Sequence, residues 1–528
     1  MRFPITNELK PEARMLYPVG IQSFEKIRQG GYVYVDKTSL VYKLANEGCY
    51  YFLSRPRRFG KSLLVSTMEA YFQGRKELFE SLAISKLEKN WEEYPVLHFD
   101  FSGKSYAQPD SLSDILNIHL KQMEAKYGVE VISDACDSRL KVIIETAYRK
   151  TGKKVVVLVD EYDKPIIDNL TRPGLRDSFR ETLEGFYGVL KAKDDYIRFG
   201  FLTGVTKIGK MSVFSGLNNI QDISMRAEYT GICGVSESEL KSYFSESVSK
   251  LAAANSLTVA ECYEKLATMY DGYHFRQDCE GVYNPYSLLC AFNYNEFDCY
   301  WFETGTPSFL VQYLKDGKYN LDDISKNTVS INMLTGTNYA EPAVLTLMYQ
   351  SGYLTIKGYD ERFKKYYLDY PNEEVKSGFL DSLSQMFAPA LIIDGAFSAS
   401  CFVSDIESGD VSGFMNRLTA FLSDNNYEIQ GDLELYFQNT ISLVFKMMGL
   451  YVKTEYQTSN GRIDVVIQTS QFIYIIELKR DQSPDIALQQ IEAKGYDKPF
   501  LAAGQKIIKL GINFSSETRT IDGWKMAE

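Results

Sequence analysis

Residues 50–64 read YYFLSRPRRFGKSLL, and this stretch decides the fold. An apolar run at 50–54 predicts a buried strand, the next residues break it, and a helical pattern opens at 60–62. A strand, a loop and a helix that begins with Gly-Lys-Ser are typical of a phosphate-binding loop. Such a loop needs inward-pointing backbone N–H groups, a lysine for the outer phosphates and a hydroxyl for Mg²⁺. Gly60, Lys61 and Ser62 supply these three elements.

The start of this loop is irregular. The usual pattern GxxxxGK[ST] has glycine where this chain has Arg55, and the loop continues as Pro56-Arg57-Arg58-Phe59. We expect Arg57, Arg58 and Phe59 to lie beside the phosphates, although a basic helix cap without nucleotide would read the same. Lys207 and Lys210, further along the chain, are either phosphate contacts or solvated charges.

A second apolar strand supports the nucleotide interpretation. The apolar residues 155–159 are followed by Asp160 and Glu161. A nucleotide-binding site of this kind carries its Mg²⁺-side acid and its water-activating glutamate at these two positions. The next strand leads to Thr203 and Thr206, and either hydroxyl would be placed to sense a terminal phosphate. We assign Thr203 to this role.

Strands and helices alternate through the first part of the chain. Strand-length apolar runs at 96–101 and 199–202 are separated by helical patterns at 111–126 and 137–149. This alternation predicts an α/β fold with a parallel sheet between two layers of helices. The run at 96–101 also fits the ATPase class that has an additional central strand.

The chain organisation suggests four parts. Residues 1–235 carry the phosphate loop, and the helical stretch 236–325 is interpreted as a lid. Residues 326–420 contain a helix, two strands and a helix that resemble a small winged-helix-like unit, or a plain connector, followed by a linker expected within 382–430. Residues 421–528 predict a compact C-terminal α/β domain.

The C-terminal domain contains two acids and a lysine on neighbouring strands. Asp464 lies in one strand, whereas Glu477 and Lys479 lie two apart on the next and project from one face. Two acids can hold Mg²⁺ while a lysine helps to activate water, as metal-dependent phosphodiester hydrolysis requires. An edge strand facing water is the alternative. Further candidates near this cluster are the metal-side acid Glu434, Gln490 and Tyr496.

Composition bounds the classes of protein. The 528 residues are 45% hydrophobic and 24% charged, which excludes disorder, collagen-like repeats and coiled coil. The net charge of −11 argues against coating nucleic acid through bulk charge. Eight scattered cysteines and three histidines give no zinc-ligand spacing, and no apolar run would span a bilayer, so we expect a cytoplasmic protein with reduced thiols and no membrane contact.

These motifs resemble a known family. The first 300 residues are similar to the AAA-ATPase-like family of STAND-type P-loop NTPases, in which the Arg-Pro-Arg-Arg-Phe loop is the usual form. The C-terminus resembles the PD-(D/E)XK nuclease superfamily. The stretches that carry the resemblance are YVDKTSLVYKL (34–44), SRPRRFGKSLL (54–64), VVVLVDEYDKPI (155–166), FLTGVTKIGKMSVFSGLNN (201–219), YDGYHF (270–275), GRIDVVI (461–467), IIELK (475–479) and ALQQIEAKGY (487–496).

The resemblance implies roles for the matching residues. It implies ATP and Mg²⁺ as cofactors, with Lys61 on phosphate, Ser62 and Asp160 on Mg²⁺, and Glu161 as catalytic base. In the C-terminal domain it implies two metal-binding acids, Asp464 and Glu477, and an active-site lysine, Lys479.

The function expected on this basis is an ATPase coupled to a Mg²⁺-dependent nuclease that acts on nucleic acid, with DNA preferred, in defence or mobile-element biology. A nucleotide-dependent regulator with a degenerate nuclease fold and an ATPase acting on proteins are the alternatives. The sequence leaves homo-oligomer formation open.

Overall fold

The computed structural model describes residues 15–131, 133–207, 219–301, 328–335, 344–387, 395–423, 451–458, 461–518 and 520–527. The chain divides into two compact units. The first unit comprises residues 1–305 and 328–376, and the second comprises 306–327 and 377–528. The division therefore separates the two candidate sites.

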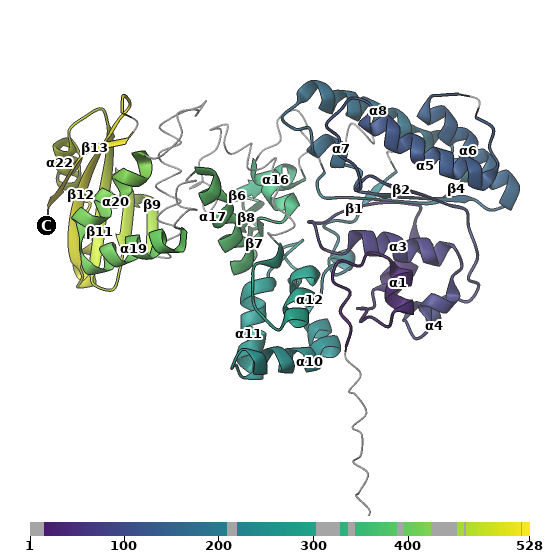
Figure 1. Ribbon diagram of the computed structural model, residues 1–528, viewed down its shortest axis with the longest axis horizontal. Helices are drawn as coiled ribbons and strands as arrows, with labels where there is room; N and C mark the ends of the chain where they lie inside the picture. Colours follow the sequence, from purple (N-terminus) through teal and green to yellow (C-terminus); the bar gives the residue numbers. More distant parts are fainter. Residues whose placement is uncertain are drawn as a thin grey trace, which may run out of the picture. The chain divides into compact units, whose positions relative to one another are not determined.

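A parallel five-stranded sheet forms the centre of the first unit (Figure 1). Its order is β2-β3-β4-β1-β5, so β4 is inserted between the strand of the phosphate loop and the strand that ends in the two acids. The inserted strand is β4, whereas β2, the run at 96–101, lies at the sheet edge. The strands are β1 (Tyr50–Ser54), β2 (Val96–Asp100), β3 (Val155–Asp160), β4 (Ile197–Gly204) and β5 (Gln221–Asp222).

Helices cover both faces of this sheet, as the alternating sequence pattern predicts (Figure 1). Left-handed glycines end two of them, Gly128 and Gly152. One layer contains α1 (Phe24–Gln29), α2 (Thr38–Glu47), α3 (Lys61–Phe72) and α4 (Ile84–Leu87). The other contains α5 (Ser111–Tyr127), α6 (Cys136–Thr151), α7 (Lys164–Ile167) and α8 (Pro173–Ala192). Short 3₁₀ turns are η1 (Lys76–Phe79), η2 (Asp194–Tyr196) and η3 (Ala227–Tyr229).

Three helices follow where a lid is expected: α10 (Glu237–Ala254), α11 (Val259–Tyr270) and α12 (Pro285–Tyr294). Ser236 and Thr258 form capping boxes with the glutamates three residues on, which satisfies the first backbone N–H groups of α10 and α11. Asn284 caps α12, and proline follows at its first position. These caps fix the three helix starts.

A small antiparallel sheet, ordered β6-β8-β7, completes the first unit. The first helix and the two strands expected within residues 326–420 are present as α16, β7 and β8. Their assignment as a winged-helix-like unit stays a prediction. The elements are β6 (Thr328–Ser330), α15 (Ile331–Leu334), α16 (Val344–Ser351), β7 (Thr355–Asp360), β8 (Lys365–Asp369) and α17 (Glu373–Phe387), and the division between the units falls within α17.

The second unit contains a five-stranded mixed sheet in the order β13-β12-β11-β10-β9. Strands β9 to β11 form an antiparallel meander, α22 makes the crossover to the parallel neighbour β12, and β13 returns antiparallel. The elements are β9 (Tyr451–Thr458), β10 (Gly461–Gln468), β11 (Phe472–Arg480), α22 (Pro484–Lys494), η5 (Lys498–Ala503), β12 (Lys506–Ser515) and β13 (Thr520–Ala527).

The linker expected within 382–430 is wrong for residues 395–423. These residues form α19 (Gly395–Ser408) and α20 (Val411–Ser423), and their buried side chains, Phe402 and Phe414 among them, join the core beneath the sheet. Alternate residues on the opposite face pack against α22. Residues 424–450, between α20 and β9, lie outside the described residues.

No helix in the described ranges is long and apolar enough to cross a membrane.

Candidate functional site

The phosphate loop lies at the carboxyl edge of the parallel sheet, where crevices of such sheets bind ligands. Strand β1 ends at Ser54, and helix α3 begins at Lys61. Between them Arg58 and Gly60 have backbone φ angles of 65° and 87°, in the left-handed region. Glycine adopts that conformation without strain, which explains Gly60 at the helix start.

Lys61 is buried and turned back onto its own loop. Its Nζ donates to the carbonyl oxygens of Arg55, at 3.0 Å, and Pro56, at 2.9 Å. Two backbone acceptors therefore stabilise the ammonium group in the place of a phosphate. A ligand bearing negative charge can replace those carbonyls as the stronger partner.

The two acids after β3 have different surroundings. Asp160 is buried, and one of its carboxylate oxygens accepts hydrogen bonds from the Thr203 hydroxyl and from the Glu161 backbone N–H. Glu161 has a φ of 53°, a strained conformation of the kind that gathers at functional sites. Burial raises the pKa of Glu161, while Lys61 acts in the opposite direction. A raised pKa suits a carboxylate that must take a proton near neutral pH.

Thr203 and Thr206 are both fully buried. The Thr203 hydroxyl donates its hydrogen bond to Asp160, so Thr203 holds that carboxylate in position. Thr206 donates its backbone N–H and its hydroxyl to the carboxylate of Asp163, which also accepts from the Val205 N–H. Asp163 thus fixes the segment that follows β4.

A cavity of about 350 Å³ opens in front of the loop. Lys61, Glu161 and Ser62 reach it from the sheet edge, and Tyr286 and Leu289 bound it from α12. A smaller apolar cavity of about 100 Å³ shares Gly60, Leu63, Leu289 and two prolines with it. The remaining lining of the larger cavity includes Gly20, Ile21, Gln22, Arg57, Arg58, Ser102 and Lys164.

Arg55, in the place of the first loop glycine, is a buried structural residue. Its guanidinium donates to the carbonyl oxygens of Ser54 (2.9 Å), Ser224 (2.8 Å) and Tyr229 (3.0 Å). It also lies 3.9 Å from the centre of the Phe275 ring. Burial lowers its pKa to about 10, so it stays charged at neutral pH.

The other loop residues contact the helical region. Phe59 is buried against the rings of Tyr273 and Phe275, with centroids 4.7 and 5.7 Å apart. The Arg58 guanidinium lies 4.8 Å from the centre of the Tyr286 ring. The carbonyl of Arg57 accepts from Trp301 Nε1 at 3.1 Å. The loop is therefore fixed by side chains from distant parts of the sequence.

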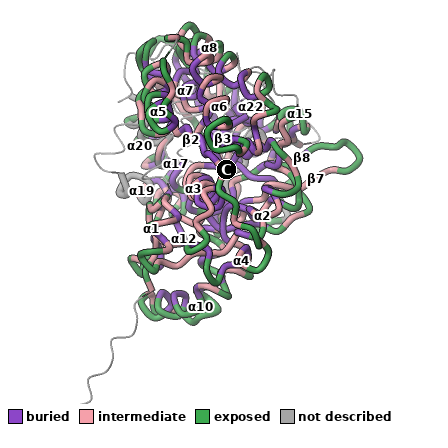
Figure 2. Tube along the Cα trace, turned by 90° about the vertical axis from the view of Figure 1, so that its right-hand side faces the viewer, coloured by how far each residue is buried: buried purple, intermediate pink, exposed green. Residues whose placement is uncertain are grey.

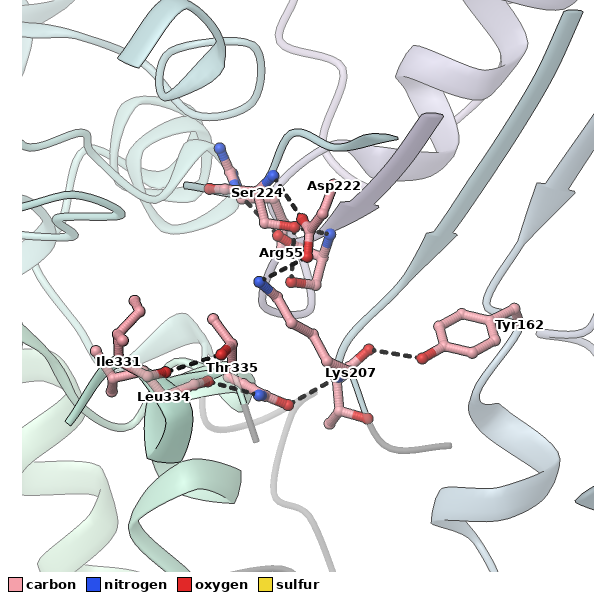
Figure 3. A network of polar contacts seen from close by, with 11 residues as sticks. Arg55, Tyr162, Lys207, Asp222, Ser224, Ile331, Leu334 and Thr335 are labelled. Atoms are coloured by element: carbon pink, nitrogen blue, oxygen red, sulfur yellow. Dashed lines mark hydrogen bonds and ion pairs between the residues drawn. The ribbon is translucent and has the colours of Figure 1, made fainter. Parts of the chain in front are cut away.

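Lys207 belongs to a buried polar network behind the loop (Figure 3). Its Nζ pairs with Asp222 at 3.0 Å, and its backbone N–H donates to Gln350 of α16 at 2.8 Å. Gln350 in turn donates to the Leu334 carbonyl. Lys207 is thus neither a solvated charge nor a residue lining the large cavity. Lys210 lies outside the described residues.

The second candidate site lies on the face of the C-terminal sheet that α22 covers. Asp464 Oδ2 accepts from the Leu478 N–H at 2.8 Å, and Lys479 Nζ donates to Glu477 Oε1 at 3.1 Å. The structure therefore brings Asp464, Glu477 and Lys479 together. Burial, and then the charge of Asp464, raise the pKa of Glu477 to about 7.

Gln490 on α22 donates its amide to Glu477 Oε1. Tyr496 is buried against the adjacent strand, and its hydroxyl leaves room only for glycine at Gly461. Glu434 lies outside the described residues. Among the described residues, no three His, Cys, Asp or Glu side chains lie close enough together to hold a metal ion.

Sequence reasoning missed several cavity residues. Ser102 follows the end of β2, and Lys164 follows the acids after β3. The rule that parallel strands present their carboxyl ends at one edge would have placed both. Trp301 could not have been found in this way, because nothing near it in sequence marks a contact with the loop.

The fold and both sites define a class of protein. It has an α/β domain with a phosphate loop, joined to a second domain whose mixed sheet carries a cluster of two carboxylates and a lysine. A family model described as "Predicted AAA-ATPase" matches residues 18–214, and one described as "PD-(D/E)XK nuclease superfamily" matches residues 432–524. The expected α/β fold class is confirmed.

The chain is similar over nearly its whole length to a protein of Azotobacter chroococcum mcd 1 described as "Uncharacterized protein in vnfD 5'region". The two are 34% identical over 523 residues, which is 97% of this chain and 99% of that protein. The chain belongs to the predicted AAA-ATPase family with a C-terminal PD-(D/E)XK nuclease superfamily domain. The chain is also similar to the Aeropyrum pernix ORC2 protein, which was solved with ADPNP and ADP. The two are 12% identical over 72% of this chain and 97% of that protein, with a TM-score of 0.27.

Proposed function

We propose that this protein binds and hydrolyses ATP and couples that reaction to a Mg²⁺-dependent nuclease site that cleaves nucleic acid. The observation that carries the proposal is the presence, in one chain, of two buried charged clusters. One surrounds a cavity at a phosphate loop, and the other holds two carboxylates and a lysine on one sheet face. The loop and its acids lie within the residues matched by the AAA-ATPase model, and the carboxylates and lysine lie within those matched by the nuclease model.

In the first site Lys61 and Ser62 would hold the phosphates and the Mg²⁺ ion, with Asp160 on the metal side. Lys61 would exchange two loop carbonyls for phosphate oxygens. Glu161 would accept the proton of the attacking water, a role that its position on the cavity and raised pKa support. Thr203 would orient Asp160 through its hydrogen bond.

The apolar cavity next to the loop suits the nucleobase. It shares Gly60 and Leu63 with the larger cavity, so a base there would be continuous with phosphates at the loop. Tyr34, Val35 and Ile232 supply apolar walls. Apolar walls with few polar groups are typical of the part of a pocket that holds a flat ring.

The loop's contacts support a switch. The Arg57 carbonyl accepts from Trp301, and a Cβ at Gly352, which follows α16, would lie 2.7 Å from Pro56. A shift of the loop on nucleotide binding would therefore displace the helical region or the small sheet. We propose that this displacement controls access of nucleic acid to the second site.

In the second site the residues fit a hard divalent cation. Glu477 Oε2 is buried and has no hydrogen-bond partner among the described residues, and a cation would supply one. Asp464 and Glu477 would hold the ion, which polarises a phosphodiester and lowers the pKa of bound water. Lys479 would orient the attacking water beside them and offset the phosphate charge.

ATP binding tests the first half. Lys61→Ala should weaken ATP affinity at least 100-fold by isothermal titration calorimetry, because the loop loses its phosphate cation. Lys86→Ala, an exposed lysine of α4, is the matched control and should bind normally. Undiminished affinity in Lys61→Ala would remove the nucleotide assignment.

Cleavage tests the second half. Purified protein should cut DNA with Mg²⁺ or Mn²⁺, and Glu477→Ala should abolish cutting while ATP hydrolysis continues. Glu492→Ala, an exposed acid on α22, is the control. Nucleic-acid binding with no cutting under any condition would instead favour a regulator with a degenerate nuclease fold. Cutting that persists in Glu477→Ala contradicts the assigned site.

A further inference from the structure

The hairpin formed by β7 and β8 ends in an exposed tip. Residues 361–365, at the turn of this hairpin, are all exposed. Phe363 at the tip is 64% exposed, which is unusual for a phenylalanine. Figure 2 shows this green end of the hairpin projecting beyond the small sheet. An exposed ring at the end of a protruding hairpin needs a reason.

The tip is held in shape by its own strands. Asp360 Oδ1 accepts from the Phe363 N–H at 2.9 Å, and Lys364 adopts a left-handed φ of 50° that closes the turn. Behind the tip the rings of Tyr359 and Tyr366 pack with centroids 4.7 Å apart. Phe363 is therefore presented by an ordered turn.

Three cations lie next to the exposed ring in sequence. Arg362, Lys364 and Lys365 are exposed and form no ion pair within the described part of the chain. The Arg362 guanidinium lies 5.2 Å from the centre of the Phe363 ring. Of the nearby acids, Asp360 caps the turn, which leaves Glu361 as the free acid of the tip. Three exposed cations, two on the turn and Lys365 at the start of β8, stand out in a chain of net charge −11.

We propose that this hairpin tip binds the backbone of DNA, with Arg362, Lys364 and Lys365 on phosphates and Phe363 against an exposed base or sugar. Phosphates would supply the anions that the three cations lack, and aromatic rings stack on bases regardless of sequence. An acidic protein surface would satisfy the cations but gives no reason for a ring among them. The tip therefore fits a polynucleotide better than a protein.

The inference rests on the proposed function in one respect, the nucleic-acid substrate. Residues 421–528 contain 11 basic and 14 acidic residues, so the nuclease-like region has no excess of positive charge to hold DNA. A second element must contribute that attraction. The tip belongs to the first unit, so it would deliver this contact from the nucleotide-binding part of the chain.

The test measures binding without metal, so that cleavage is not required. Full-length protein in EDTA is titrated against a labelled DNA duplex and its single strand, at several salt concentrations. Replacing Arg362, Lys364 and Lys365 by Gln should weaken binding on the order of 100-fold at low salt and reduce the salt slope on duplex by about 2 to 3, one phosphate per cation. Phe363→Ala should weaken single-strand binding about tenfold and duplex binding less.

The matched control removes the same charges elsewhere. Arg149, Lys121 and Lys150 are exposed on α5 and α6, and their replacement by Gln should leave affinity and slope within twofold of the parent. Equal effects of the two triple variants, or no DNA binding by the parent, overturn the proposal. Tip-dependent binding without any cutting would support the tip and remove the proposed nuclease activity. DNA cleavage that is unchanged in the tip variants would support the proposed nuclease activity and remove the proposed role of the tip.

Discussion

The phosphate-loop site and the carboxylate site both bury charged side chains, but they stabilise them differently. Lys61 donates to two carbonyls of its own loop, and Asp160 accepts two hydrogen bonds. Glu477, in contrast, keeps one carboxylate oxygen without a hydrogen-bond partner among the described residues. The first site must exchange bonds when a ligand arrives, whereas the second gains a partner. Ligand binding should therefore rearrange the first site and stabilise the second.

The largest expected effect is on stability, and it tests whether Arg55 has a structural role while Arg58 lies at the ligand cavity. Arg55→Ala should lower the free energy of unfolding of the first unit by about 3 to 5 kcal/mol, because several backbone carbonyls lose a buried charged donor and a cavity opens. Arg58→Ala, with its guanidinium over an aromatic ring at the cavity, should cost about 1 kcal/mol or less. Urea denaturation compares the two. Equal stabilities would show that Arg55 is no structural residue.

A buried acid outside both sites sharpens the comparison. Glu374, at the start of α17, accepts from the Trp301 N–H and the Ser287 hydroxyl, yet its Oε2 has no partner in the described structure. Burial raises its pKa to about 7. Because the folded state then binds a proton more tightly, stability should fall as pH rises from about 4.5 to 7 and level off above, by about 3 kcal/mol.

Glu374→Gln mimics the protonated acid and should remove this pH dependence. Thermal unfolding at pH 5 and pH 8 measures the change, with the variant the more stable protein at pH 8 and nearly equal to the parent at pH 5. If the variant loses stability with rising pH as steeply as the parent, the pH dependence of stability comes from another titratable group.

The next effect concerns the carboxylate site itself. Glu477→Gln removes a buried charge and should stabilise the metal-free protein at pH 8 by about 3 kcal/mol, since the raised pKa reflects the cost of ionising Glu477. Mg²⁺ should raise the unfolding temperature of the parent and of Glu374→Gln, but not of Glu477→Gln. Mg²⁺ stabilisation that survives Glu477→Gln would place the ion elsewhere.

The smallest effect tests the contact between the loop and the helical region. Trp301→Phe keeps a ring against Tyr353 but deprives the Arg57 carbonyl of its Nε1 donor. One neutral hydrogen bond is worth about 1 kcal/mol, so ATP affinity should change only about fivefold by calorimetry. A change of 100-fold would mean that Trp301 does more than hold the carbonyl.

Sequence patterns predicted elements well where local chemistry marks both ends. Strand β1 begins directly after Gly48 and Cys49 and stops before Arg55 and Pro56, so its predicted bounds, 50–54, match the structure. The order of the strands could not be read in this way. The insertion of β4 depends on pairing between segments far apart in sequence, which no local pattern encodes.

The residues of the sites were easier to select than their partners. The positions of Lys61, Glu161 and Glu477 follow from motifs, whereas the burial of Arg55 and the pairing of Lys207 with Asp222 depend on tertiary contacts. The linker prediction failed for a related reason. The mixed polar composition of 395–423 conceals apolar positions, such as Phe402 and Phe414, that share one buried core.

Trp301 gives the protein an optical property. It is one of three tryptophans in the chain, with Trp91 and Trp524, and its indole N–H bonds directly to a carbonyl of the phosphate loop. Indole emission responds to the loss of such a bond and to a change in local polarity. Movement of the loop on nucleotide binding would therefore change the intrinsic fluorescence of the unlabelled protein. Rapid mixing with nucleotide would then give the rate of this movement.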